Sequence, residues 1–423
     1  MRELSIWFLF LTLFSLFPMT SLAECTFELT PRISLSQVYD DNIYLDNTNE
    51  KSDNLTTVSP GINMTISSLN RTLSLDYAPT LVFYHKEEKN DTVRHSGTLD
   101  LAQKLTEHLG FDLTDTYLKS EQPLEETEGV EGARNTRNTY QRNTGSASLR
   151  YQFGPEDTIT LGYRHNLLDN EDPELVDGTI QNPFSSIAYW FNIGNGLELD
   201  YGFSKADFTR DDDAEGGDDY TGHATGIRYI HRFTPHSRGS IGYDFTNRSF
   251  EGFTEDYEVH EGTVGLEHAF SPDLSLSIGG GYFIQQNEIS DDVTGYSYDA
   301  SLAKRFERGS ISIGGQGGWD EAYLEAERRG FTTYWSAETR LEYQLMERLN
   351  SYAGGSFRQD KDSENREWET WRGNCGLRLG FLRWFSLSLD YSYTERDDDV
   401  DTEDYRANRV MLLLTTSKQY RWE

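Results

Sequence analysis

Charged side chains recur inside segments in which apolar and polar residues alternate. In one segment, Leu197, Leu199 and Tyr201 alternate with Glu198 and Asp200. A period of two puts the charges on one face of a β-strand and the apolar side chains on the other. If the sheet closes on itself, charges on its inner face set the selectivity of an aqueous channel. The pore-lining candidates on this basis are Arg150, Arg164, Arg228, Arg232, Glu198, Asp200, Asp244, Arg378 and Asp390.

The signs of these candidates allow two interpretations. In the first, the arginines between positions 150 and 232 form a basic wall that binds anionic cargo. In the second, they pair across strands with Glu198, Asp200 and Asp244 and keep a polar lumen neutral. The sequence leaves both interpretations open.

Residues that could support catalysis are present without a catalytic pattern. The sequence has no G-x-S-x-G, H-E-x-x-H, P-loop or C-x-x-C motif. Its nine histidines are scattered, and His108, His165, His231 and His268 lie within or near strands without partner spacing. We therefore expect no enzymatic activity, no cofactor and no metal centre.

Long acidic stretches separate many of the alternating segments. Ten of them together carry a charge equal to the formal net charge of the whole chain, −33. Two of them, RDDDAEGGDD (210–219) and ERDDDVDTED (395–404), have the carboxylates that Ca²⁺ prefers but not the spacing of an EF-hand. We expect a hydrated acidic rim that meets lipopolysaccharide through divalent cations. The acidity argues against nucleic acid as a partner.

The elements that position these residues are long strands joined by alternating short turns and long loops. Short turn signals recur about every 39 residues, and each strand covers roughly 10–14 residues. Average strands in globular proteins have about 5–6 residues, whereas a transmembrane barrel strand needs about 9–11. We predict an all-β fold, a transmembrane antiparallel up-and-down β-barrel of about 18–20 strands. A β-propeller is the alternative at this repeat length, but the sequence lacks its four short strands per repeat.

Aromatic residues on the apolar faces form two rows, as expected for the two interfaces of a bilayer. One row stands beside the short turns: Phe111, Phe153, Phe191, Phe233, Phe270, Phe306 and Phe381. The other stands further along the strands: Tyr163, Tyr201, Tyr243, Tyr282, Trp319, Trp335 and Tyr391. Val82 breaks the pattern, because it is apolar on an otherwise polar face.

The two ends of the chain agree with export to an outer membrane. Residues 1–23 read as a signal peptide, with cleavage expected after Ala23, and residues 24–423 as the barrel. An N-terminal membrane anchor is the alternative, and Glu24 disfavours lipidation of Cys25. Whether Cys25 pairs with Cys375 stays open. The C-terminal alternation ends on Trp422, one residue before the end, as in barrel assembly signals.

Two segments, ISLSQVYDDNIYLD (33–46) and SPGINMTISSLNRTLSLDYAPTLVFY (59–84), carry a resemblance to a known family. With their Tyr-x-Asp-Asn loop and Leu-x-Leu-x-Tyr strand they resemble the start of the β-barrel porin 2 family. They are also similar to outer-membrane barrels associated with exopolysaccharide and exosortase loci. The resemblance implies a protein of the Gram-negative outer membrane and, further, a passage for secreted polysaccharide.

The resulting expectation is a porin-like channel that exports polysaccharide across the outer membrane. Its partners would be outer-membrane lipid and lipopolysaccharide, with polysaccharide cargo and a periplasmic export apparatus. The alternative is a structural or adhesive surface barrel whose acidic loops bind cations and whose lumen carries no specific traffic.

Overall fold

The computed structural model describes residues 25–122, 137–172, 175–209, 219–252, 254–322, 330–363 and 365–422. The predicted signal peptide lies outside the described residues, as does nearly all of the acidic stretch at 210–219. Within these ranges, no helix is long and apolar enough to cross a bilayer.

The described strands form one antiparallel sheet. They are β1 (Thr26–Asp40), β2 (Asp53–Ser68), β3 (Arg71–Tyr84), β4 (Thr92–Lys104), β5 (Leu109–Ser120), β6 (Tyr140–Gln152), β7 (Thr158–Asn170), β8 (Asp177–Asn192), β9 (Asn195–Thr209), β10 (Tyr220–Thr234), β11 (Ser237–Phe250), β12 (Tyr257–Ser271), β13 (Leu274–Asn287), β14 (Val293–Phe306), β15 (Gly309–Ala322), β16 (Gly330–Met346), β17 (Leu349–Asp362), β18 (Glu367–Leu382), β19 (Phe385–Asp398), β20 (Tyr405–Ser417) and β21 (Tyr420–Trp422). Among the described residues, two short 3₁₀ helices lie in loops: η2 (Glu88–Asn90) and η3 (Asp401–Glu403).

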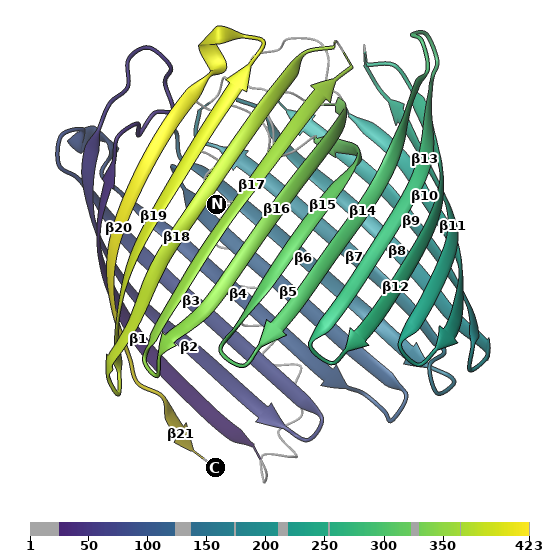
Figure 1. Cartoon of the computed structure of the whole chain (residues 1–423), viewed down its shortest axis with the longest axis horizontal. Coiled ribbons are helices and arrows are strands. Elements are labelled where there is room, and N and C mark those ends of the chain that lie inside the picture. Colours follow the sequence, from purple (N-terminus) through teal and green to yellow (C-terminus); the bar gives the residue numbers. More distant parts are fainter. Residues whose placement is uncertain are drawn as a thin grey trace.

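The sheet closes because β1 pairs with β2 on one side and with β20 on the other. The short strand β21 continues this pairing along the start of β1, where the rings of Phe27 and Trp422 stack 5.3 Å apart. Figure 1 shows the resulting cylinder of tilted strands, with β21 at its lower edge. The predicted up-and-down barrel is confirmed, with twenty long strands among the described residues, at the upper end of the expected number.

The two ends of the cylinder differ in the length of their connections. Short turns, such as residues 193–194 and 235–236, lie at the lower edge in Figure 1, and longer loops, such as 41–52 and 288–292, lie at the upper edge. Bacterial barrels keep their short turns on the periplasmic side. We therefore name the two edges the periplasmic end and the extracellular end.

Alternation along each strand gives the barrel an exposed apolar outer face. Leu199 is paired with Ile227, which is paired with Tyr243, and these side chains are 40%, 45% and 45% exposed. Exposing such an apolar surface to water is unfavourable, whereas contact with lipid chains is favourable. Most of the predicted aromatic residues share this face and are exposed there: Phe153, Phe191, Phe233, Phe270, Phe306, Phe381, Tyr163, Tyr201, Tyr243, Tyr282, Trp335 and Tyr391.

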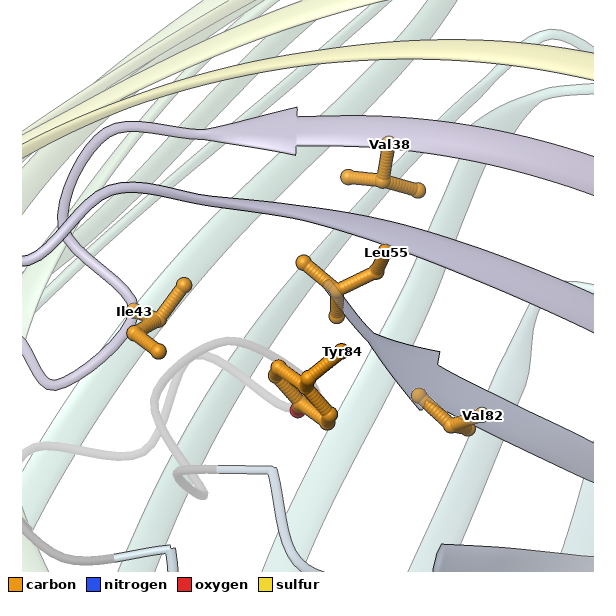
Figure 2. Close-up of a cluster of buried hydrophobic side chains, with 5 residues drawn as sticks. All are labelled: Val38, Ile43, Leu55, Val82 and Tyr84. Atoms are coloured by element: carbon orange, nitrogen blue, oxygen red, sulfur yellow. The ribbon is translucent and has the colours of Figure 1, made fainter. Parts of the chain in front are cut away.

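The inner face is not polar throughout, because apolar side chains bury one another at the extracellular end. Val82, the exception in the sequence pattern, is 1% exposed and packs with Val38, Leu55 and Tyr84. Figure 2 shows Ile43 of loop 41–52 turned toward this cluster. Comparable clusters form around Tyr220, Phe283 and Tyr140. Val82 is therefore one of several apolar residues on the inner face at this end, and not a single exception.

The β15–β16 hairpin leaves the cylinder near its extracellular end. β15 stops pairing with β14 at Gly317, whereas its pairing with β16 continues to Gly330. Gly318 and Gly330 have φ angles of +156° and +135°, which a side chain would strain. The upper part of the hairpin turns inward, and we call residues 318–322 and 330–334 the inward hairpin.

Trp319, on the inward hairpin, does not join the outer aromatic row. Its Nε1 donates a hydrogen bond of 3.0 Å to Glu261 on β12, and its ring stacks on that of Phe331. Phe331 is 5% exposed and contacts Tyr257 and Phe283. The prediction for Trp319 was wrong because the hairpin turn overrides strand parity.

Candidate functional site in the barrel lumen

The nine predicted pore-lining residues all lie on the inner face. Each has at least one exposed apolar neighbour on its strand, and some, such as Arg150 between Leu149 and Tyr151, have one on either side. Register places Glu198 opposite Arg228 and Asp244 opposite Glu261.

The closest association among the nine lies on β9, β10 and β11. Arg228 Nη1 lies 3.7 Å from Glu198 Oε2. Gly226 stands between Asp200 and Asp244 in register. A Cβ atom at Gly226 would lie 2.7 Å from Asp244 Oδ1 and 3.9 Å from Asp200 Oδ2, so this glycine makes room for two carboxylates. This patch of the wall has more acid than base.

Arg232 lies further toward the periplasmic end and is held by other partners. Its guanidinium carbon is 3.6 Å from the centre of the Trp190 ring, and Nη2 is 2.5 Å from Glu156 Oε2. The hydrogen bond from Arg232 lowers the pKa of the Glu156 carboxyl, which lies in the turn between β6 and β7. Arg232 on β10 therefore holds the turn between β6 and β7 beside Trp190 on β8.

Arg150 and Arg164 lie apart from the other two arginines. They belong to β6 and β7, and β8 and β9 separate them from β10. Arg164 lies 5.6 Å from the Phe184 ring, which occupies the space left by Gly162. The four arginines therefore do not stand on one continuous stretch of wall.

Arg378 and Asp390 lie on β18 and β19, far around the barrel from the group on β9 to β11. Asp390 accepts hydrogen bonds from the Tyr352 hydroxyl at 2.5 Å and from the Ser388 hydroxyl at 2.7 Å. Gly376 makes this possible, because a Cβ atom there would lie 2.6 Å from both Asp390 and Tyr352. Arg378 is paired in register with Ser388, beside this cluster.

A cavity of about 530 Å³ opens in the inner wall between β9 and β16. Register leads from Glu198 and Arg228 along this wall to Ser297 on β14, two residues before Asp299, which is paired with Gln316 on β15. Trp319 and Tyr334 of the inward hairpin also line it. We call this space the wall cavity. It combines ionic groups, small residues and two aromatic rings, and it holds two of the nine predicted residues, Glu198 and Arg228.

The extracellular mouth is organised by the first loop, which carries the Tyr-x-Asp-Asn motif. The Asn42 side chain is fully buried: its Nδ2 donates to the carbonyls of Asp46 and Arg406, and its Oδ1 accepts from the Asp46 N–H. Asp53, also fully buried, accepts hydrogen bonds from the backbone N–H groups of residues 85–87. Buried polar groups of this kind fix a loop in one conformation.

A second series of contacts joins this loop to the segment between β5 and β6, through Arg137. The Arg137 guanidinium donates to the carbonyl of Ile43 and to the Tyr84 hydroxyl, which in turn donates to Glu121. Burial alone would raise the pKa of the Glu121 carboxyl, but Arg94, 2.5 Å away, outweighs it and the pKa is lowered. The loops are thus tied to one another inside the mouth.

Acidic residues of the stretch at 395–404 form ion pairs with arginines of this chain. Asp398 is buried and pairs with Arg396 at 2.8 Å and with Arg366, and Glu403 also reaches Arg366. No group of three or more His, Cys, Asp or Glu residues that could hold a metal ion occurs in the described ranges. Cys25 and Cys375 are not joined by a disulfide.

Three histidines on the outer face, His95, His223 and His260, have tyrosine partners that the sequence did not reveal. The hydroxyl of Tyr201 lies 2.9 Å from His223 Nδ1, and the equivalent distance from Tyr243 to His260 is 2.7 Å. Tyr77 and His95 repeat the arrangement. The partners stand on neighbouring strands 17–22 residues apart, so a search for short spacings does not find them.

Solved structures match this fold at low sequence identity. The siderophore receptor PirA from Pseudomonas aeruginosa matches with a TM-score of 0.56 and 8% identity, over 92% of this chain and 80% of the receptor. A mutant of the ferric enterobactin receptor PfeA from the same bacterium gives 0.54 and 8%, over the same shares. OccAB4 from Acinetobacter baumannii gives 0.43 and 12%, over 95% of this chain and 100% of that one.

Neither a known family profile nor a curated protein sequence matches the chain. The likeness to the two receptors is therefore one of fold. Together with the apolar outer face and the unequal ends of the cylinder, it shows that the chain has the fold of an outer-membrane β-barrel.

Proposed function

We propose that this barrel is a channel that carries polysaccharide outward across the outer membrane. The observation that supports it best is a row of small residues across four neighbouring strands of the inner face. Gly242, Thr263, Gly281 and Ser297 follow one another in register on β11 to β14. Small side chains leave the lumen wide, and barrels of sixteen or more strands have room for an aqueous channel.

The choice of polysaccharide as cargo rests on the resemblance of residues 33–46 and 59–84 to barrels of exopolysaccharide loci. The periplasmic end would then receive the polymer from an export apparatus. Pairing of Arg228 with Glu198 and of Arg232 with Glu156 favours a lumen without a strong anion-binding wall. The proposal includes no catalytic step.

Two measurements test the proposal. The purified chain in planar bilayers should give discrete, stable conductance steps, and deletion of its gene should reduce the polysaccharide at the cell surface. Conductance with unchanged polysaccharide would remove the cargo and leave a general porin. A barrel that inserts but does not conduct would contradict the channel itself.

A structural or adhesive barrel is the second candidate, and the contacts across the mouth favour it. Asn42, Asp53 and Arg137 tie the first loops to one another and to β20 at the mouth. This candidate predicts an inserted barrel with no conductance and a loss of surface attachment on deletion.

A further inference from the structure

The wall cavity has the features of a ligand site. Of the nine predicted residues, only Glu198 and Arg228 line it. Its roof is the inward hairpin, through Trp319 and Tyr334. Trp319 is fixed there by its hydrogen bond to Glu261, and Tyr334 by the Arg358 guanidinium 4.0 Å from its ring centre. Two fixed aromatic rings therefore stand over a polar floor. The volume, about 530 Å³, is in the range of small-molecule sites.

The charges of the floor are largely paired with one another. Arg228 lies 3.7 Å from Glu198, and Arg238 Nη2 lies 2.8 Å from Glu267 Oε1. Glu261 accepts hydrogen bonds from Trp319 and from the Ser297 hydroxyl. Each pair keeps further donor and acceptor positions, because a guanidinium has five N–H donors and a carboxylate about four lone pairs.

Asp299 and Gln316 face each other in register at the side of the cavity. Both are exposed to the lumen. Asp299 lies across Gly279, where a Cβ atom would meet its carboxylate at 1.9 Å. The carboxylate and the amide thus form one surface that accepts and donates hydrogen bonds.

The lining discriminates between classes of ligand. Its four carboxylates exceed its two guanidiniums, so an anion would be repelled. A bare metal ion would find no group of three converging ligands in the described part of the chain. An apolar ligand would leave the paired ions desolvated and poorly satisfied. An uncharged ligand with many hydroxyls and an apolar ring face meets all of these conditions.

We propose that the wall cavity is a binding subsite for an uncharged saccharide. Its hydroxyls would bond to Asp299, Gln316 and the Glu198–Arg228 pair, and its ring face would pack on Trp319. The inference rests on the proposed function, because it names the class of sugar that the channel holds: a neutral one rather than an acidic one.

The test uses the purified full chain in planar bilayers with an uncharged trisaccharide as the probe. Polyethylene glycol of matched hydrodynamic radius, a trisaccharide of uronic acids and 1,4-diaminobutane serve as comparison probes. The uncharged trisaccharide should interrupt the current in a saturable way, and the three comparison probes should not. Asp299→Ala and Gln316→Ala should each weaken this block about tenfold, as loss of one hydrogen-bonding group in a polar site does.

Asp100→Ala is the matched control, because Asp100 lies on the inner face of β4, away from the cavity, and bonds to Thr114. Heat-modified migration in gels confirms that each variant is folded. Equal block by polyethylene glycol, block by the acidic sugar or the diamine alone, or unchanged block in both variants would overturn the subsite.

Calorimetry of the uncharged trisaccharide on the same protein in detergent separates this proposal from the one before it. Saccharide binding that the two variants weaken, without conductance, would overturn the channel and keep the subsite. Conductance without saccharide binding would overturn the subsite and keep the channel.

Discussion

Asp41 and Asn408 join the first and the last long strand of the barrel, although 367 residues separate them in the sequence. The Asp41 carboxylate accepts hydrogen bonds from the Asn408 backbone N–H at 2.6 Å and from its side-chain amide at 2.8 Å. Asp41 N–H returns a bond of 3.2 Å to the Asn408 carbonyl. The motif that carried the family resemblance therefore acts, at least in part, to fasten β1 to β20 at the extracellular end.

Asn42→Ala should destabilise this seam. The substitution leaves the Asp46 and Arg406 carbonyls and the Asp46 N–H without their buried partner. Losing partners of this kind costs about 1–3 kcal/mol. Chemical unfolding in detergent, followed by tryptophan fluorescence, measures the loss. Asn49→Ala is the control in the same loop, because that residue is exposed. Equal stability of the two variants would contradict the role given to Asn42.

Asp398→Ala should be among the most destabilising substitutions in the acidic stretch at 395–404. It would leave the buried guanidiniums of Arg366 and Arg396 without a shared counter-charge. Breaking a buried ion pair from one side costs about 3–5 kcal/mol. Asp401→Ala removes an equal charge from an exposed position and should have little effect. If both variants lost the same stability, the Asp398 network would make no contribution of its own to the loop.

Gly330→Ala should strain the inward hairpin through the backbone alone. A Cβ atom at Gly330 meets nothing within 4 Å, but φ there is +135°. Strain of this kind costs about 1–3 kcal/mol. Gly373→Ala is the matched control, because its Cβ also meets nothing and no positive φ accompanies it. Comparison of the two unfolding free energies measures the effect. A smaller loss for Gly330→Ala than for Gly373→Ala would argue against the observed hairpin geometry.

The contact between loops 251–256 and 288–292 should weaken in acid. The Ser290 hydroxyl lowers the pKa of Glu255, against a smaller opposing effect of burial, and the N–H groups of Ser290 and Ile289 lower it further. A carboxyl with a lowered folded-state pKa stabilises above its ordinary value, 4.5, and loses this contribution as the pH falls through the folded pKa. Protection of the two amides against hydrogen exchange should therefore fall below pH 4.5.

Glu255→Ala should lower the protection of the Ile289 and Ser290 amides already at neutral pH. The protection of these amides should then no longer depend on pH, because the titrating carboxyl is gone. Glu288→Ala, at an exposed position in the neighbouring loop, should have neither effect. Protection in Glu255→Ala equal to that of the unsubstituted chain at pH 7 would show that the carboxylate does not hold the loops together.

Strand alternation predicted the barrel because it depends on local geometry alone. Glu198 and Leu199 must point to opposite sides of any strand that contains both. The same reasoning failed for Trp319, which lies beyond Gly317, the last residue of β15 that pairs with β14. It also gave no reason for Val82, whose partner Ile43 comes from a folded loop.

Partner choice within the lumen was harder to predict than orientation. Arg232 pairs with Glu156 of a turn 76 residues earlier, rather than with an acid of a neighbouring strand. The cavity under the inward hairpin depends on the same non-local turn. Such contacts follow from closure and from the positions of loops, neither of which leaves a periodic signal in the sequence.

Alternating accessibility along β9 tests most directly the claim that the polar face lines water and the apolar face meets lipid. Single cysteines at Glu198, Leu199 and Asp200, in a background of Cys25→Ser and Cys375→Ser, are reacted with a charged maleimide in reconstituted vesicles. The account predicts labelling at positions 198 and 200, and protection at 199 that a lipid-soluble maleimide overcomes. Labelling of 199 by the charged reagent, with 198 and 200 protected, would contradict it.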